Sequence, residues 1–287
     1  MKQKLLALLI TGLSVLIYAI SLDDVVNNLI SSSYEVTRVV RETGISSSFR
    51  VERVTKIGSY KLIKINSPFK NYVWLRGSLG EYVIINDIAF EPAIDLTDLE
   101  DQFIDLVSSK KYDLLLSLDL PIGYKFIIKK DLTTFEATFD EHLRLVKLRK
   151  SYPFYSMEIN YQNYAVLSDK SSEELSQYIF GVKKIRAPLK LSREYLKQHF
   201  QWVAMDFSYN GLGSTYTLYF YSAAFGKIAL YLLADADNTE LLDTIQDMCA
   251  NSPVSYATRK LGNVLAILIG SQALDLMDIL DSLLKLK

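Results

Sequence analysis

Helical and strand-like spacings of hydrophobic residues alternate along this chain. Residues 22–33 place apolar side chains at helical intervals behind Asp23 and Asp24, whose charges suit the positive end of a helix dipole. Residues 95–111 repeat this pattern, with acidic residues early and Lys110 and Lys111 late. The spacing therefore predicts an amphipathic helix at each of these two positions.

Short runs rich in β-branched and aromatic residues flank the second of these helices. Gly, Pro and Asn residues separate the runs, and the gaps are too short for the crossovers that parallel strands need. We therefore predict an antiparallel meander that the second helix interrupts. Its predicted strands are residues 34–41, 47–55, 60–65, 72–75, 82–85, 112–120, 124–130, 133–140, 143–149 and 155–164.

The expected fold class is α+β with two domains. A sheet of about ten strands rarely stays flat, and both helices have an apolar face to bury. Residues 22–180 are therefore predicted to form an antiparallel β half-barrel covered by helices, and the proline-containing, basic residues 181–190 a linker. Residues 191–287 are predicted to form a smaller α+β domain, with strands at 200–207, 214–221, 228–233 and 263–269 and helices at 241–249 and 274–286.

Residues 1–21 have the pattern of a signal peptide. Two lysines precede an apolar run over residues 5–18, and small residues follow at Ala19 and Ser21. Cleavage after Ala19 or after Ser21 would leave a mature chain that is periplasmic or extracytoplasmic. The alternative is an uncleaved N-terminal anchor.

Composition and charge narrow the possible classes of protein. The chain is 49% hydrophobic and 12% aromatic, which indicates a globular protein rich in strands. Its net charge of −1 argues against nucleic-acid binding, which needs a concentrated basic surface. The single cysteine, Cys249, has no partner for an internal disulfide, and we expect a buried thiol; a reactive thiol is the alternative.

Sequence patterns of catalytic and metal sites are not found. His142 and His199 lack the spacing of a zinc-ligand pair, and the chain has no Gly-x-Ser-x-Gly nucleophile elbow. Residues 235–240 superficially resemble a calcium loop but lack its glycine and its final glutamate, so a helix N-cap at Asp237 or Asn238 is the better interpretation. We predict no catalytic residue, no metal and no cofactor; an exported enzyme remains an alternative.

Apolar side chains supply the positive evidence for a binding function. Alternate strand residues together with a helix face would line the interior of the half-barrel, and such interiors are common ligand sites. The alternative is that these side chains only fill a core. The predicted lining is Phe49, Val51, Leu62, Trp74, Phe126, Ile128, Phe135 and Phe139 on strands, with Phe103 and Leu106 on the second helix.

Three stretches carry a resemblance to known families. The hairpin over residues 112–130 and the strands over 133–164 are similar to the closing strands of the LolA and LppX-like superfamily, the outer-membrane lipoprotein-sorting type. Tyr-Asn-Gly-Leu at 209–212, before the strand at 214–221, resembles the Tyr-Ser-Asp-Gly-Leu stretch of the two-domain RseB (MucB) family, with Asn210 in place of aspartate. Residues 262–270 are similar to a late strand of that family.

The resemblance implies a function that needs no catalysis. In these families a β half-barrel covered by helices binds acyl chains or a protein partner. We therefore expect an exported binding protein for the acyl chains of lipids or lipoproteins. The alternative that the resemblance implies is an envelope-stress regulator that binds a membrane-anchored anti-sigma factor.

Overall fold

The computed structural model describes residues 20–44, 47–67, 71–167, 174–175, 177–200, 202–209, 214–222, 224–234 and 240–285. They divide into two compact units, neither of which is continuous in sequence. Unit 1 takes the described parts of Met1–Gly58, Ile65–Lys70 and Thr97–Lys170, and unit 2 those of Ser59–Lys64, Asn71–Leu96 and Ser171–Lys287. The predicted signal peptide lies outside the described residues except for Ile20 and Ser21, and the predicted domain boundaries stay a prediction.

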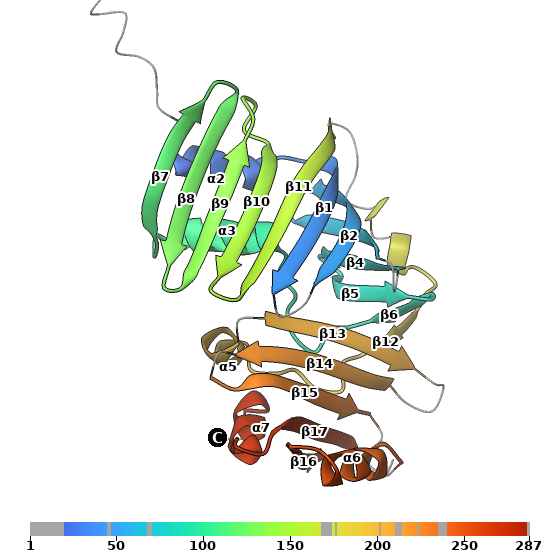
Figure 1. The fold of residues 1–287 in the computed structure, drawn as a ribbon. Helices are drawn as coiled ribbons and strands as arrows, with labels where there is room; N and C mark the ends of the chain where they lie inside the picture. Colours follow the sequence, from blue (N-terminus) through green and yellow to red (C-terminus); the bar gives the residue numbers. More distant parts are fainter. Residues whose placement is uncertain are drawn as a thin grey trace, which may run out of the picture. The chain divides into compact units, whose positions relative to one another are not determined.

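Unit 1 is built on an antiparallel sheet (Figure 1). Every strand predicted for this part of the chain is confirmed within a few residues. Their order across the sheet is β2 (Ser48–Ile57), β1 (Tyr34–Gly44), β11 (Tyr155–Val166), β10 (Leu145–Tyr152), β9 (Thr133–Phe139), β8 (Gly123–Lys130) and β7 (Asp113–Leu120).

Two helices, α2 (Leu22–Ser31) and α3 (Leu99–Ser109), lie on one face of this sheet (Figure 1). Both predicted helices are thus confirmed. Ser21 caps α2 and forms a reciprocal capping box with Asp24, and Asp98 caps α3 by accepting from the Asp101 amide. The helices bury apolar stripes, which leaves the opposite face of the sheet to solvent.

Unit 2 contains two sets of strands. The first has the order β12 (Lys183–Ile185), β6 (Ile88–Phe90), β5 (Gly80–Ile85), β4 (Asn71–Gly77) and β3 (Tyr60–Asn66). The second is a five-stranded sheet with the order β13 (Trp202–Tyr209), β14 (Ser214–Ser222), β15 (Gly226–Leu233), β17 (Val264–Ser271) and β16 (Val254–Leu261). Its helices are α5 (Arg193–His199), α6 (Glu240–Ala250) and α7 (Leu276–Leu283), with a 3-10 turn at Gln177–Ile179.

Several elements of unit 2 depart from the prediction. Strand β12 lies inside the predicted linker and pairs with β6 in parallel, whereas only antiparallel pairs were expected. It is too short to show an alternation of its own, and its partner lies far away in sequence. Strands β6 and β16 and helix α5 were also missed, and the stretches at 235–239 and 210–213 lie outside the described residues.

The helices of the described residues are short. Among them, no helix is both long enough and apolar enough to cross a bilayer.

Candidate functional site

An aromatic layer joins α3 to the sheet of unit 1. Phe103 of α3 has its ring centroid 6.1 Å from that of Phe135 and 6.3 Å from that of Phe139, and Phe126 lies 6.1 Å from Phe139. Alternation along β9, and over Phe126 to Ile128 of β8, points these rings to the helix face. Six predicted lining residues are therefore buried together, namely Phe103, Leu106, Phe126, Ile128, Phe135 and Phe139. Their role in lining a ligand site stays a prediction.

Phe49 and Val51 lie on the wrong face for the predicted lining. Their side chains are 49% and 36% exposed, whereas Glu52 and Val54 of the same strand are buried. Phe49 pairs with Arg41 of β1, whose guanidinium lies 6.0 Å from the centroid of its ring on the exposed face. The physical reason is that the inward row of β2 starts with charged residues that have partners in the interior.

Leu62 and Trp74 are buried but belong to unit 2. The indole nitrogen of Trp74 donates to Glu81 Oε1 at 2.8 Å, and the Leu96 amide donates to Glu81 Oε2 at 3.2 Å. Burial raises the pKa of Glu81 despite these two donors. Trp74 therefore takes part in a hydrogen-bonded cluster around Glu81 in unit 2.

A buried charge cluster occupies the part of the unit 1 interior under β1 and β2. Arg38 is 1% exposed, and its guanidinium donates to Glu52 Oε2 at 2.6 and 3.0 Å. It also donates to Asp98 Oδ2, the helix cap, at 2.9 Å. Arg50 donates to the other oxygen of Glu52 at 2.8 Å and to Glu42 at 2.6 Å. Burial disfavours the charged Arg38, but Glu52 and Asp98 outweigh it and raise its pKa well above the usual value.

Tyrosine hydroxyls bind the fully buried carboxylate of Glu100 on α3. Tyr34 donates to Glu100 Oε1 at 2.6 Å and Tyr161 to Oε2 at 3.4 Å. Burial and the charge of Glu100 raise the pKa of both tyrosines well above the usual value, so both hydroxyls stay protonated donors.

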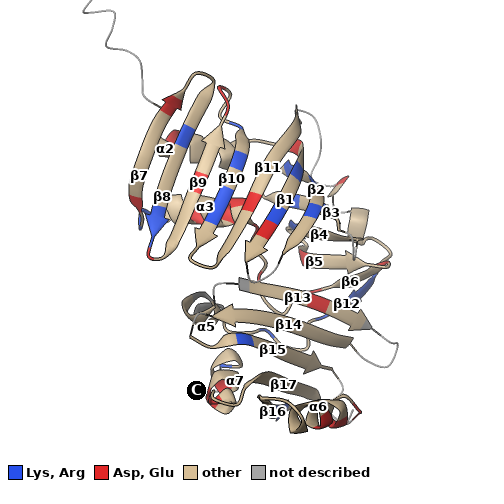
Figure 2. Ribbon diagram, in the orientation of Figure 1, with Lys and Arg blue, Asp and Glu red and all other residues tan. Residues whose placement is uncertain are grey.

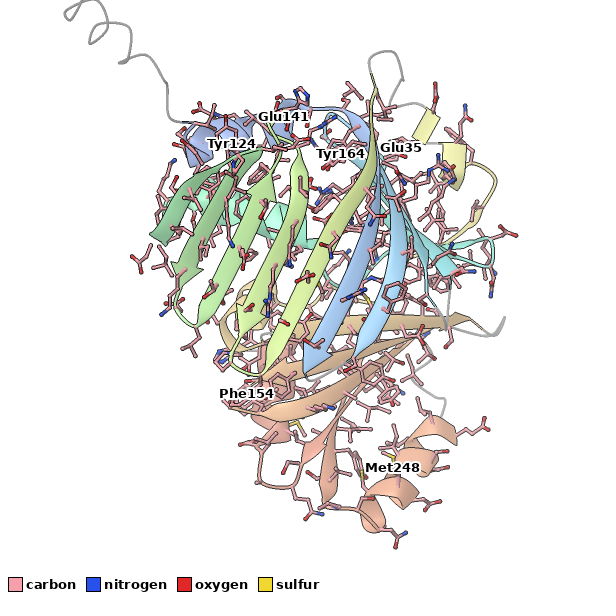
Figure 3. All side chains as sticks on the ribbon, turned by 45° about the horizontal axis from the view of Figure 1, so that its top comes forward. Glu35, Tyr124, Glu141, Phe154, Tyr164 and Met248 are labelled. Atoms are coloured by element: carbon pink, nitrogen blue, oxygen red, sulfur yellow. The ribbon has the colours of Figure 1, made fainter. Side chains whose placement is uncertain are left out.

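Tyr164 stacks on Tyr161 at the end of β11, where Glu35 of β1 also lies (Figure 3). Its ring centroid is 6.2 Å from that of Tyr161. Its buried hydroxyl has no hydrogen-bond partner among the described residues, and burial raises its pKa. This hydroxyl is a donor that a ligand could use.

Lys56 of β2 fixes the end of α2. Its ammonium donates to the carbonyl oxygens of Leu29, Ile30 and Ser32 at 2.5, 2.9 and 3.0 Å. A cation at these carbonyls complements the negative end of the helix dipole. Both helices are therefore held to β1 and β2 by charged side chains, in addition to their apolar faces.

Sequence reasoning missed the charge cluster, although a signal was present. Along β1, the inward positions alternate through Tyr34, Val36, Arg38, Val40 and Glu42. Charged residues at positions of a buried alternation indicate paired buried charges. The partners come from β2 and α3, and which of them pair could only be seen in three dimensions.

The opposite face of the unit 1 sheet carries charges of both signs (Figure 2). Lys125 of β8 pairs with Glu136 of β9 at 2.7 Å, and Lys147 of β10 pairs with Glu158 of β11 at 2.9 Å. Mixed, mutually compensated charges are typical of a solvated surface. The buried aromatic residues of β8 and β9 therefore lie on the other face of the sheet, under the helices.

The described residues offer few side chains for catalysis or metal binding. His142 is exposed beside Glu141, 3.7 Å away, and His199 ends α5 against the ring of Tyr195. No group of three or more His, Cys, Asp or Glu side chains in the described ranges could hold a metal ion. Cys249 is partly buried, and burial raises the pKa of its thiol.

Comparison with known proteins gives structural likenesses at low sequence identity. No protein-family model and no curated protein matches the chain. An uncharacterised conserved protein from Thermus thermophilus is similar over 57% of this chain and 96% of its own, with 11% identity and a TM-score of 0.42.

Two further structures are similar over about half of this chain. One is a putative outer membrane lipoprotein-sorting protein domain from Vibrio parahaemolyticus, similar over 52% of this chain and 91% of its own, with 11% identity and a TM-score of 0.27. The other is the lipoprotein LppX of Mycobacterium tuberculosis, similar over 53% of this chain and 100% of its own, with 11% identity and a TM-score of 0.28. At these values the likenesses do not assign the chain to a family.

Proposed function

We propose that this protein is an exported, non-enzymatic binding protein for the acyl chains of lipids or lipoproteins in the cell envelope. The observation that carries the proposal is the aromatic layer between α3 and strands β8 and β9. An acyl chain needs apolar neighbours and no fixed polar partner. In this proposal the ligand replaces contacts that Phe103 now makes with the sheet.

The energetics support an apolar ligand without a specific polar site. Burying an acyl chain contributes about 0.8 kcal/mol per methylene, or roughly 11 kcal/mol for about fourteen carbons. Association costs of about 4–15 kcal/mol oppose this gain. The affinity therefore depends on how many of the apolar contacts in the interior of unit 1 the acyl chain makes in place of those it displaces.

A pair of tryptophan reporters tests the proposal. Phe139→Trp places an indole in the aromatic layer, and Phe49→Trp places one on the exposed face of the same sheet. We expect a brominated fatty acid to quench the first reporter saturably and to leave the second unchanged, each measured against the parent protein. Equal quenching of both reporters, or quenching of neither, would overturn the proposal.

Native mass spectrometry of the protein from its own host's envelope fraction tests the ligand class independently. A co-purified lipid or acylated peptide of defined mass supports the carrier. A protein that arrives empty and bound to a membrane protein favours the second candidate, a regulator that binds a membrane-anchored anti-sigma factor. The observation that favours this candidate is a second compact unit with a five-stranded sheet of its own.

The helix cap of α2 bears on where the signal peptide is cleaved. Cleavage after Ser21 would remove the capping box with Asp24 and leave a charged amino group at Leu22, at the positive end of the helix. A lost cap costs about 1 kcal/mol. We therefore infer cleavage after Ala19, and mass spectrometry of the mature protein should show Ile20 as its first residue, whereas Leu22 would contradict the inference.

A further inference from the structure

Strand β7 ends the sheet of unit 1 with one long side unpaired among the described residues (Figure 1). It pairs with β8 alone, and its sequence, Asp-Leu-Leu-Leu-Ser-Leu-Asp-Leu, is mostly leucine. Leu114, Leu115 and Leu118 are 52%, 56% and 46% exposed. Long apolar edges of this kind readily pair with another strand.

Two of the usual protections of an exposed edge are missing from β7, whose charged residues are Asp113 and Asp119. The strand contains no lysine and no proline, and Pro121 follows only after its last residue. One irregularity is present: Leu115 has no partner on β8, because the register shifts between Leu114 and Leu116. From Leu116 to Leu120 the strand is regular and open.

We propose that β7 pairs with β7 of a second copy of this chain, antiparallel, with the two-fold axis at Ser117. In this register Leu116 lies opposite the partner's Leu118 and Leu118 opposite the partner's Leu116. Leu116 and Leu118 lie on the same face of the sheet as Lys125 of β8. The two copies together therefore place four leucines in one cross-strand cluster.

Charge supports this register over the one centred on Leu116. Asp119 lies opposite the partner's Leu115, and Asp113 opposite the partner's Pro121, so no two acidic side chains face each other. Shifting the axis from Ser117 to Leu116 would place Asp113 opposite the partner's Asp119 twice, which is unfavourable. The strand is therefore self-complementary in the register centred on Ser117.

Symmetry explains why a second copy suits this edge. A two-fold antiparallel pair uses the β7 edge of both copies at once, so the assembly closes and leaves no β7 edge exposed. One strand pair is much smaller than a standard interface of about 1,600 Å². The dimer is therefore weak and depends on protein concentration.

Disulfide trapping tests the register. In a Cys249→Ser background, Ser117→Cys places two thiols at the axis, where Cα atoms of opposed residues are about 4.5–5.5 Å apart, within the range of about 4.4–6.8 Å for a disulfide. We expect this variant to form a linked dimer under mild oxidation. Leu115→Cys and Asp119→Cys should link only when the two proteins are mixed.

Sedimentation velocity tests the association itself. Leu118→Lys places a charge in the leucine cluster and should abolish the concentration-dependent increase in sedimentation coefficient. Leu132→Lys is the matched control, because Leu132 is also an exposed leucine but lies in the β8–β9 turn. A parent protein that stays monomeric at all concentrations, or cysteines that link without regard to position, would overturn the proposal.

Discussion

Replacing Arg38 with methionine is the most informative single change in unit 1. The substitution keeps a long, unbranched side chain but removes three charge-assisted hydrogen bonds, two to Glu52 and one to Asp98. Glu52 retains Arg50, but the interior loses the positive charge that lies between Glu52 and Asp98. Breaking a buried ion pair by removing one partner costs about 3–5 kcal/mol.

The expected loss in the free energy of unfolding is therefore about 4 kcal/mol near neutral pH, measured by urea denaturation followed by circular dichroism. Arg38→Lys keeps the charge but not the planar fork, so its loss should be smaller. Arg149→Met, on the exposed face of β10, should change stability by about 0.5 kcal/mol or less.

Acid provides a second readout of the same reasoning. Acid removes the negative charge that Arg38→Met leaves uncompensated in the interior, so the stability difference from the parent protein should shrink as the pH falls. A methionine variant as stable as the parent near neutral pH, or a difference that grows in acid, would refute the assigned role of Arg38.

Three further changes test other contacts of unit 1. Lys56→Met removes the donor at the end of α2 and should cost about 2–3 kcal/mol of unfolding free energy in urea. Tyr34→Phe should lower the free energy of unfolding by about 1.5–3 kcal/mol, because it removes the shorter of the two tyrosine hydrogen bonds to Glu100. Tyr164→Phe should be nearly neutral, because it removes a hydroxyl without a partner among the described residues. The fold raises the pKa of Tyr34 and Tyr161 above the ordinary 10.0, so the stability they contribute is complete below pH 10.0 and is lost above it; tyrosinate absorbance should therefore rise together with unfolding.

Controls and contrary results are available for each of these changes. Lys129→Met alters an exposed lysine of β8 and should leave stability within about 0.5 kcal/mol. Equal effects of Tyr34→Phe and Tyr164→Phe would contradict the hydrogen-bond assignments. Tyrosine titration that is complete well before unfolding would contradict the burial of Tyr34 and Tyr161.

The sequence pattern predicts those helices and strands of this fold that depend mainly on residues close together in the chain. Helices α2 and α3 were predicted from an apolar stripe and acidic first turns, and Asp98 and Ser21 do cap them. Phe126, Ile128, Phe135 and Phe139 were predicted to face the interior from their alternate positions on two strands, and all four are buried. In such segments the two faces of a strand can be told apart from sequence.

Sequence fails where the partner of a residue lies far along the chain. Phe49 and Val51 alternate as an inward row would, yet β2 turns them outward because Glu52 meets Arg38 and, through it, Asp98 of α3. Strand β12 depends on a parallel partner that is distant in sequence. No short window along the chain contains both Arg38 and Asp98, or both β12 and β6.

The position of β1 has a consequence for biosynthesis. It pairs with β2, the next strand along the chain, but its other neighbour is β11, with Tyr34 opposite Val166. At about 5–20 residues per second, β11 leaves the ribosome on the order of ten seconds after β1. During that interval the β1–β2 hairpin has an open edge, and Arg38 lacks Asp98 until α3 has been made. Nascent chains should therefore depend on a holding chaperone until β11 has been made.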